Sequence, residues 1–144
     1  MKSTLLAALL LAAAPAAAAC PNAGLAQRPV TLVTARGKFV YTLEVAATAA
    51  EQECGLMYRK TMPQTVGMLF PFDQPRSASF WMDKTVLPLD LIFVGPNRRV
   101  LSIATGKPFS RDIIDSGGIA ASVIELNAGE AARIGLKPGD KVKG

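Results

Sequence analysis

The sequence has 144 residues, a formal net charge of +5 and no histidine. This length suits one domain with a modest hydrophobic core. The lack of histidine excludes Ser-His-Asp and Cys-His catalysis, zinc sites built on His, and imidazole proton relays. The basic residues are scattered rather than clustered with aromatic residues, so we expect no nucleic-acid partner.

The first 19 residues have the organisation of a secretory signal peptide. Lys2 supplies a positive start, residues 5–14 form an apolar run too short to span a bilayer, and small residues precede Cys20. We therefore expect residues 1–19 to be a signal peptide, residues 20–29 a lead-in and residues 30–144 a single β domain. The protein would be periplasmic in a host with an outer membrane, and otherwise extracellular or lipid-anchored.

Cys20 and Cys54 are the two cysteines of the chain. An even number of cysteines in an oxidising compartment permits a Cys20–Cys54 disulfide. The alternative is a lipoprotein in which Cys20 carries the lipid, and only then would a membrane be a partner. Catalysis by Cys54 is not expected, because no histidine is present to take its proton.

The part of the chain that follows the lead-in predicts a hairpin and a short helix. Residues 30–35 are rich in β-branched side chains, and residues 39–45 alternate in the manner of a strand, with a Gly turn between the two runs. Thr48 and Glu51 have the spacing of a capping box, so we expect a helix over residues 49–58.

Short predicted strands follow along the rest of the chain. They lie at residues 68–72, 77–82, 89–94, 100–105, 121–126 and 141–143. Residues 106–119 predict an irregular loop, and residues 127–134 a second helix that Gly135 ends. Helices do not alternate regularly with strands, so the pattern predicts a mainly β fold: an antiparallel β-sandwich or distorted barrel with two short helices.

The predicted strand at residues 89–94 has apolar residues on both faces, with Asp90 as its one charge. We expect this strand to be covered on both sides. A lone carboxylate buried there would cost several kcal/mol or take up a proton, so Asp90 should have a partner. The nearest candidates in sequence are Arg59 and Lys84, and backbone N–H groups are a third option.

Trp81 is the only tryptophan, and strand alternation places it on the same face as Ser77 and Ser79. An indole over a polar face suits the stacking of a sugar or another ring. The alternative is that Trp81 packs at a sheet edge or under the long loop, because large aromatic side chains more often pack than bind ligands.

The order of several motifs resembles one protein family. The motifs are GLMYR at 55–59, GMLF at 67–70, FWMDKT at 80–85, PLDLIF at 88–93, IELNAG at 124–129 and GLKPGD at 135–140. Together they resemble the family known as domain of unknown function 192, in an exported bacterial member. The resemblance implies a compact, mainly β domain with jelly-roll-like topology and no established activity.

One position departs from the pattern of that family. The residue before Gly55 is commonly Arg, whereas here it is Cys54, and a disulfide to Cys20 would give this change a structural reason. Gly55 and Gly67 themselves suit positions that need a positive φ or a close approach of the backbone.

The polar residues that core packing does not explain predict a binding site. We expect a non-catalytic small-ligand-binding or accessory module of the cell envelope, with no cofactor and no metal site. Two cations beside a tryptophan suit an anionic or ring-bearing small molecule or envelope component. The candidate site residues are Arg59, Trp81, Lys84, Thr85 and Asp90.

Two alternatives remain open at this point, although we lean against an enzyme. One is a histidine-free hydrolase of envelope sugars, in which Asp90 acts as the acid with Asp83 or Asp112 as its partner. The other is a copper handler that uses soft sulfur ligands. Its ligands would come from Cys54, Met57, Met62, Met68 and Met82.

Overall fold

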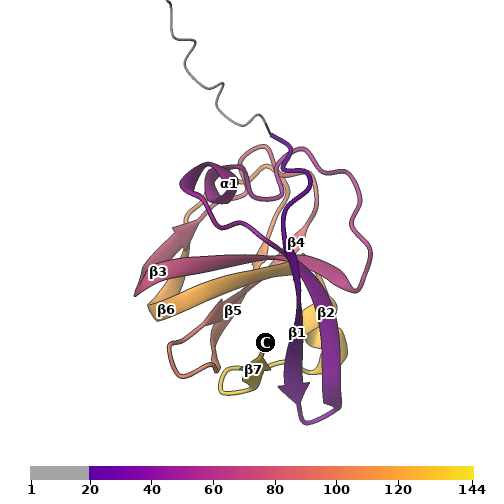
Figure 1. Ribbon diagram of the computed structural model, residues 1–144, viewed down its shortest axis with the longest axis vertical. Coiled ribbons are helices and arrows are strands. Elements are labelled where there is room, and N and C mark those ends of the chain that lie inside the picture. Colours follow the sequence, from indigo (N-terminus) through magenta and orange to yellow (C-terminus); the bar gives the residue numbers. More distant parts are fainter. Residues whose placement is uncertain (1–19) are drawn as a thin grey trace, which may run out of the picture.

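The computed structural model describes residues 20–144, and the predicted signal peptide, residues 1–19, lies outside the described residues. Within residues 20–144 the elements are β1 (Gln27–Thr34), β2 (Gly37–Val45), α1 (Ala49–Cys54), β3 (Val66–Phe80), β4 (Leu89–Val94), β5 (Val100–Gly106), β6 (Ile114–Asn127), α2 (Glu130–Ile134) and β7 (Lys141–Lys143). The strands form one sheet in the order β5-β4-β6-β3-β2-β1-β7. Figure 1 shows this sheet curled into a half-barrel, so the mainly β, distorted-barrel prediction is confirmed.

The strand pairs are antiparallel except for β2 and β3, which run parallel. A parallel pair needs a long crossover connection. Here α1 and residues 55–65 supply that connection, and Figure 1 shows α1 at one end of the curled sheet. No helix within residues 20–144 is long and apolar enough to cross a membrane.

The two ends of the sheet are tied together by the C-terminal strand. β7 pairs with β1 at one edge, and it also forms a bridge between Lys141 and Arg99, just before β5. The Val142 N–H donates to the Arg98 carbonyl at 2.9 Å. These contacts cover backbone groups that an open half-barrel would leave exposed at its edges.

Several predicted boundaries differ from the structure. β1 begins at Gln27, within the predicted lead-in 20–29. β3 is one strand through residues 66–80 rather than two, because a register shift against β6 between Pro71 and Arg76 absorbs the predicted turn. β6 starts at Ile114, within the predicted loop 106–119, because it pairs with this longer β3. The first helix ends at Cys54 instead of residue 58.

The sheet is covered on both faces, as the alternation in the fourth strand predicts. All six residues of β4 are buried. Leu89, Leu91 and Phe93 pack in one apolar cluster, the α1-side core, which includes residues that flank α1. Ile92 and Val94 pack in a second cluster, the α2-side core, which includes residues of α2. A charged residue in the middle of this sheet is therefore buried whichever way it points.

Two glycines fix how the neighbouring segments approach the sheet. A Cβ atom at Gly67 would collide with the Glu125 backbone oxygen and would lie 2.6 Å from a Leu126 methyl group. Gly55 has a φ of 48° and ends α1, and a Cβ there would lie 3.3 Å from the Phe70 ring. The predicted needs for close approach at Gly67 and for positive φ at Gly55 are confirmed.

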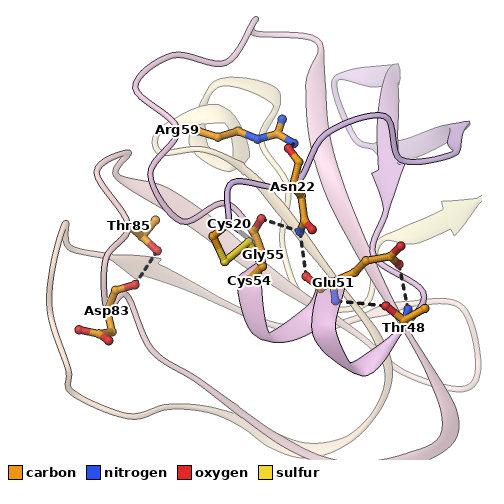
Figure 2. Close-up of a disulfide and its surroundings, with 9 residues drawn as sticks. All are labelled: Cys20, Asn22, Thr48, Glu51, Cys54, Gly55, Arg59, Asp83 and Thr85. Atoms are coloured by element: carbon orange, nitrogen blue, oxygen red, sulfur yellow. Dashed lines mark hydrogen bonds between the residues drawn. A yellow bond between two sulfur atoms is a disulfide. The ribbon is translucent and has the colours of Figure 1, made fainter. Parts of the chain in front are cut away.

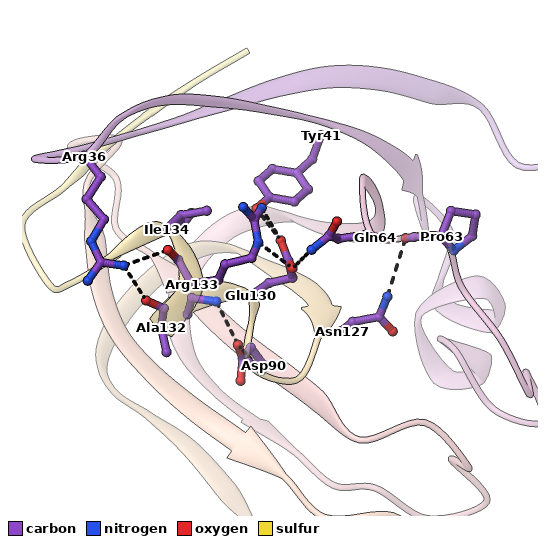
Figure 3. Close-up of polar contacts among 12 residues, drawn as sticks. Arg36, Tyr41, Pro63, Gln64, Asp90, Asn127, Glu130, Ala132, Arg133 and Ile134 are labelled. Carbon is purple, nitrogen blue, oxygen red and sulfur yellow. Dashed lines mark hydrogen bonds and ion pairs between the residues drawn. The ribbon is translucent and has the colours of Figure 1, made fainter.

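A buried carboxylate network anchors α2 to the opposite wall of the half-barrel (Figure 3). Glu130 accepts hydrogen bonds from the Tyr41 hydroxyl at 2.8 Å, from the Gln64 amide at 2.8 Å, and from two Arg133 nitrogens at 2.8 and 2.9 Å. The bonds from Arg133 lower the pKa of Glu130 to about 2, whereas burial raises the pKa of Tyr41 to about 12. Glu130 therefore stays ionised and fully paired.

Candidate ligand-binding site

Asp90 is buried on the α2 side of the sheet, where it caps α2. One carboxylate oxygen accepts from the Gly129 and Ala131 N–H groups at 3.0 and 2.9 Å, and the other accepts from the Thr105 hydroxyl at 3.2 Å. Figure 3 shows Asp90 beneath α2. The third option, backbone N–H groups, therefore supplies its partners rather than Arg59 or Lys84. Asp90 therefore has a structural role, because its carboxylate caps the start of α2, which has no side-chain cap of its own.

Arg59 also has structural partners. Its guanidinium forms a bidentate ion pair with the Glu44 carboxylate of β2 and donates a 3.0 Å hydrogen bond to the Asn22 carbonyl. Figure 2 shows Arg59 reaching Asn22 in the lead-in. The side chain thereby joins three segments that are distant in sequence, and its donors are used within the fold.

The predicted Cys20–Cys54 disulfide is present and ties the lead-in to the end of α1, with 5.5 Å between the two Cα atoms (Figure 2). The Asn22 amide strengthens this junction by donating to the Glu51 and Gly55 carbonyls at 2.9 and 3.0 Å. At the other end of α1, Thr48 and Glu51 form the predicted capping box. The short helix is thus held at both ends.

The turn after β3 is clamped from two sides. The Tyr58 N–H donates to the Lys84 carbonyl at 2.9 Å, and the Phe109 N–H donates to the Thr85 carbonyl at 3.1 Å. The buried Thr85 hydroxyl donates to the Asp83 carbonyl at 3.1 Å (Figure 2). Tyr58 and Lys84 both have positive φ, at 64° and 54°. Such conformations are costly for side-chain-bearing residues and persist only where the surroundings hold them.

The turn, α1 and β3 enclose a cavity of about 260 Å³, which we call the Glu125 cavity. Its walls include the rings of Phe70, Phe80 and Trp81, and Thr85 also lines it. A second, outer cavity of about 640 Å³ shares Trp81 and three residues of the α1 region with it. The structure thus brings Trp81 and Thr85 together, with Lys84 beside them in the outer cavity, but it places Arg59 and Asp90 elsewhere.

Glu125 on β6 is the residue of this cavity that sequence reasoning missed. It is 4% exposed, and alternation along β6 points it to the α1-side core, opposite to its neighbours Ile124 and Leu126. Burial raises its pKa from 4.5 to about 8, and no hydrogen bond or charge within residues 20–144 offsets this effect. The sequence does contain a signal for it, because Glu125 is the one charge of the predicted strand at residues 121–126, as Asp90 is of the strand at residues 89–94.

The Glu125 carboxyl group reaches the cavity. Within residues 20–144, no fully enclosed side-chain oxygen or nitrogen lacks a hydrogen-bond partner. Since Glu125 has no such partner, its oxygens must retain a small accessible area, and the cavity that it lines provides this access. A buried carboxyl group that lines a cavity with aromatic walls is an arrangement typical of ligand-binding sites.

The carboxylates proposed for a hydrolase are separated. Asp90 holds α2, whereas Asp83 lines the outer cavity, where Arg111 lies 3.6 Å from its carboxylate. Asp112 is exposed. Glycoside hydrolysis needs two carboxyl groups that face each other across the substrate, so these aspartates do not favour that chemistry.

The sulfur atoms proposed for copper are also divided. The Cys54 sulfur is bonded to Cys20 and is therefore not a thiolate ligand. Three of the methionines are buried in the α1-side core, namely Met62, Met68 and Met82. Core packing accounts for them, as the sequence pattern allows.

Comparisons with known proteins identify relatives of the whole described fold. The DUF192 family model, described as Uncharacterized ACR, matches residues 31–144. A crystal structure of a protein of unknown function from Novosphingobium aromaticivorans DSM 12444 is 45% identical, with a TM-score of 0.83 over 91% of this chain and 94% of that one. A Sinorhizobium meliloti 1021 protein, provisionally named a transcription regulator, is 40% identical, with a TM-score of 0.82 over 86% and 98%. A comparison with curated proteins gave no significant match.

Replacing Asp90 by alanine should destabilise the protein by about 2 kcal/mol, because two N–H groups at the start of α2 lose a charged acceptor. Urea denaturation of both proteins would measure this loss. Lys84→Ala, which removes an exposed cation, should change stability by less than about 0.5 kcal/mol. Equal stabilities of Asp90→Ala and the parent protein would contradict the capping role.

Replacing Glu125 by glutamine should change how stability depends on pH. Since the folded pKa of Glu125 is about 8 and its ordinary value is 4.5, the folded state binds more protons between these values than the unfolded chain. The free energy of unfolding should therefore fall as pH rises from about 5 to 8, by at most about 1.4 kcal/mol per pH unit.

The glutamine variant should lose this part of the slope, so its stability relative to the parent protein should increase with pH. Thermal or urea unfolding at pH 5 to 9 would check this. Glu53→Gln, at an exposed position on the rim of the same cavity, is the matched control. Parallel pH profiles for the parent protein and Glu125→Gln would show that Glu125 is not held as described.

Proposed function

The chain belongs to the DUF192 family, and from that premise we propose that it is an exported, non-catalytic module that binds a small molecule in the Glu125 cavity. The observation that carries the proposal is a buried carboxyl group that lines a cavity and has no partner within residues 20–144. Burying such a group costs several kcal/mol, or requires it to take up a proton. A ligand that supplies the missing hydrogen bonds recovers part of this cost.

The walls of the cavity suit a compact ligand with an apolar or ring-shaped part. Phe70 and Phe80 meet edge to face, with 5.2 Å between ring centroids and 88° between planes. Trp81, at the opening, is 44% exposed. Aromatic walls supply contact area, while Ser79 and Thr85 add hydroxyl groups. The clamped turn and the disulfide-bonded helix keep this shape in the absence of ligand, which lowers the entropic cost of binding.

Binding is favoured over catalysis by the chemistry of the lining residues. Among the described residues that line the cavity, the only carboxylate besides Glu125 is Glu53, which lies exposed on α1 at the rim. The sequence has no histidine to act as a base, and the Cys54 sulfur is held in the disulfide. One buried acid without a nucleophile or base beside it suits recognition of a ligand more than its conversion.

Export of the protein is supported by the signal-like leader and by the Cys20–Cys54 disulfide, which is typical of oxidising compartments. The disulfide also uses the Cys20 thiol that a lipid anchor would need. The partner is therefore a small molecule of the cell envelope rather than a membrane surface.

A fragment screen would test ligand binding. Ligand-observed NMR with small cationic, neutral and anionic ring compounds should give binders that compete for one site. Trp81→Ala and Glu125→Gln should weaken these binders at least several-fold, whereas Val40→Ala, at an exposed apolar residue of β2 that lines neither cavity, should not. Equal binding by all four proteins, or no binder at all, would refute the proposed function.

Expression of the full chain in a bacterium with an outer membrane would test export. Intact-mass measurement should find a periplasmic protein that starts at Cys20 and lacks the two thiol hydrogens. An uncleaved protein in the cytoplasm would overturn export. A cleaved protein with added acyl mass would show that Cys20 is lipidated instead.

A further inference from the structure

Building on the proposed function, we infer that the ligand of the Glu125 cavity is a small protonated amine with an apolar or aromatic group, and that its ammonium pairs with the Glu125 carboxylate. Three features of the cavity indicate this chemical class. They are the buried acid, the aromatic walls around it, and the distribution of the other charged groups at the cavity.

The first feature is that no group within residues 20–144 donates a hydrogen bond to the Glu125 carboxyl group. The Glu125 backbone lies between β3 and β4, opposite Met68 and Leu91, and both of these neighbours have apolar side chains. Among the described residues, none forms a hydrogen bond with this carboxyl group and no charge shifts its pKa, in contrast to Asp90 and Glu130, which have several donors each. An ammonium group supplies up to three N–H donors and the missing charge, whereas an alcohol supplies one donor and no charge.

The second feature is the aromatic character of the walls. Cations are attracted to the faces of aromatic rings, most strongly to tryptophan. Trp81 already has one such neighbour, because the Arg111 guanidinium carbon lies 5.5 Å from its ring centroid. Phe70 and Phe80 line the cavity further in and would contact the methylene groups or the ring of the ligand.

The third feature is that the cations at the cavity are directed elsewhere. Arg76 of β3 stacks on the Phe72 ring at 4.1 Å, and Arg111 lies near Asp83. Lys84 and Asp83 line the outer cavity, and Glu53 of α1 lies at the shared rim. None of these charges contributes to the pKa of Glu125, so an incoming ammonium would be its first counter-ion.

This pairing predicts that binding is linked to proton release. Since burial raises the pKa of Glu125 to about 8, the carboxyl group of the empty cavity holds a proton at neutral pH. An ammonium binds the ionised form, so the proton moves from the carboxyl group to the solvent. The affinity should therefore increase with pH, by up to about tenfold per unit, and level off above pH 8.

Three probes of similar size would test the class: benzylamine, benzyl alcohol and benzoate. Calorimetric titrations at pH 6 and pH 8, in buffers of different ionisation enthalpy, would give affinities and the number of protons released. Benzylamine should bind tightest, should gain roughly tenfold or more in affinity from pH 6 to 8, and should release about one proton at pH 6. Glu125→Gln should weaken benzylamine at least tenfold and abolish the release, whereas Val40→Ala should do neither.

The outcomes separate this inference from the proposed function. Benzyl alcohol binding as tightly as benzylamine without proton release, or benzoate binding through Arg76, would overturn the amine class but leave a ligand-binding cavity. Binding of benzylamine that Glu125→Gln leaves unchanged would also overturn the class. Failure of all three probes would count against both the class and the cavity as a binding site.

Discussion

The covering of the sheet on both faces is the constraint on which the rest of this structure depends. Because both sides of the sheet are covered, a charged residue in the middle strands is largely shielded from bulk water. Each such residue must find donors or take up a proton. Asp90 and Glu125 lie on adjacent strands, β4 and β6, yet alternation directs them to opposite cores. Their different surroundings then give them different roles.

The hydrogen bonds of these two carboxyl groups show which one has a structural role and which one is available to a ligand. Asp90 accepts two N–H groups of α2 and one hydroxyl, so removing it breaks contacts of the protein itself. Glu125 accepts no hydrogen bond from residues 20–144, so burial raises its pKa and it holds a proton at neutral pH. The Gly67 contact explains why Glu125 stays there, since β3 packs directly against its backbone and fixes the register of β6. An uncompensated group on a rigid strand is typical of a binding site.

Much of the fold could be predicted from the sequence, because it follows from local periodicity. The buried alternation of β4, the capping box of α1 and the positive φ at Gly55 all depend on neighbours that are near in sequence. The single long β3, the parallel β2–β3 pair and the early start of β6 could not, because strand pairing overrides the turn formers at residues 73–76. Of the site, Trp81 and Thr85 were predicted and Glu125 was not. The partners of a buried charge depend on tertiary contacts that one sequence does not display.

Protonation of Glu125 avoids the cost of a buried charge in the cavity, and a cationic ligand can take the place of this proton. A proton neutralises Glu125 at neutral pH, because the cost of a buried charge exceeds the cost of protonation there. The clamped turn at Thr85 and the disulfide at Cys54 oppose a collapse of the walls onto this group. A rigid cavity with a neutral acid therefore discriminates between ligands by charge. Only a cation that offsets its own desolvation through Glu125 and the aromatic rings gains from expelling the proton.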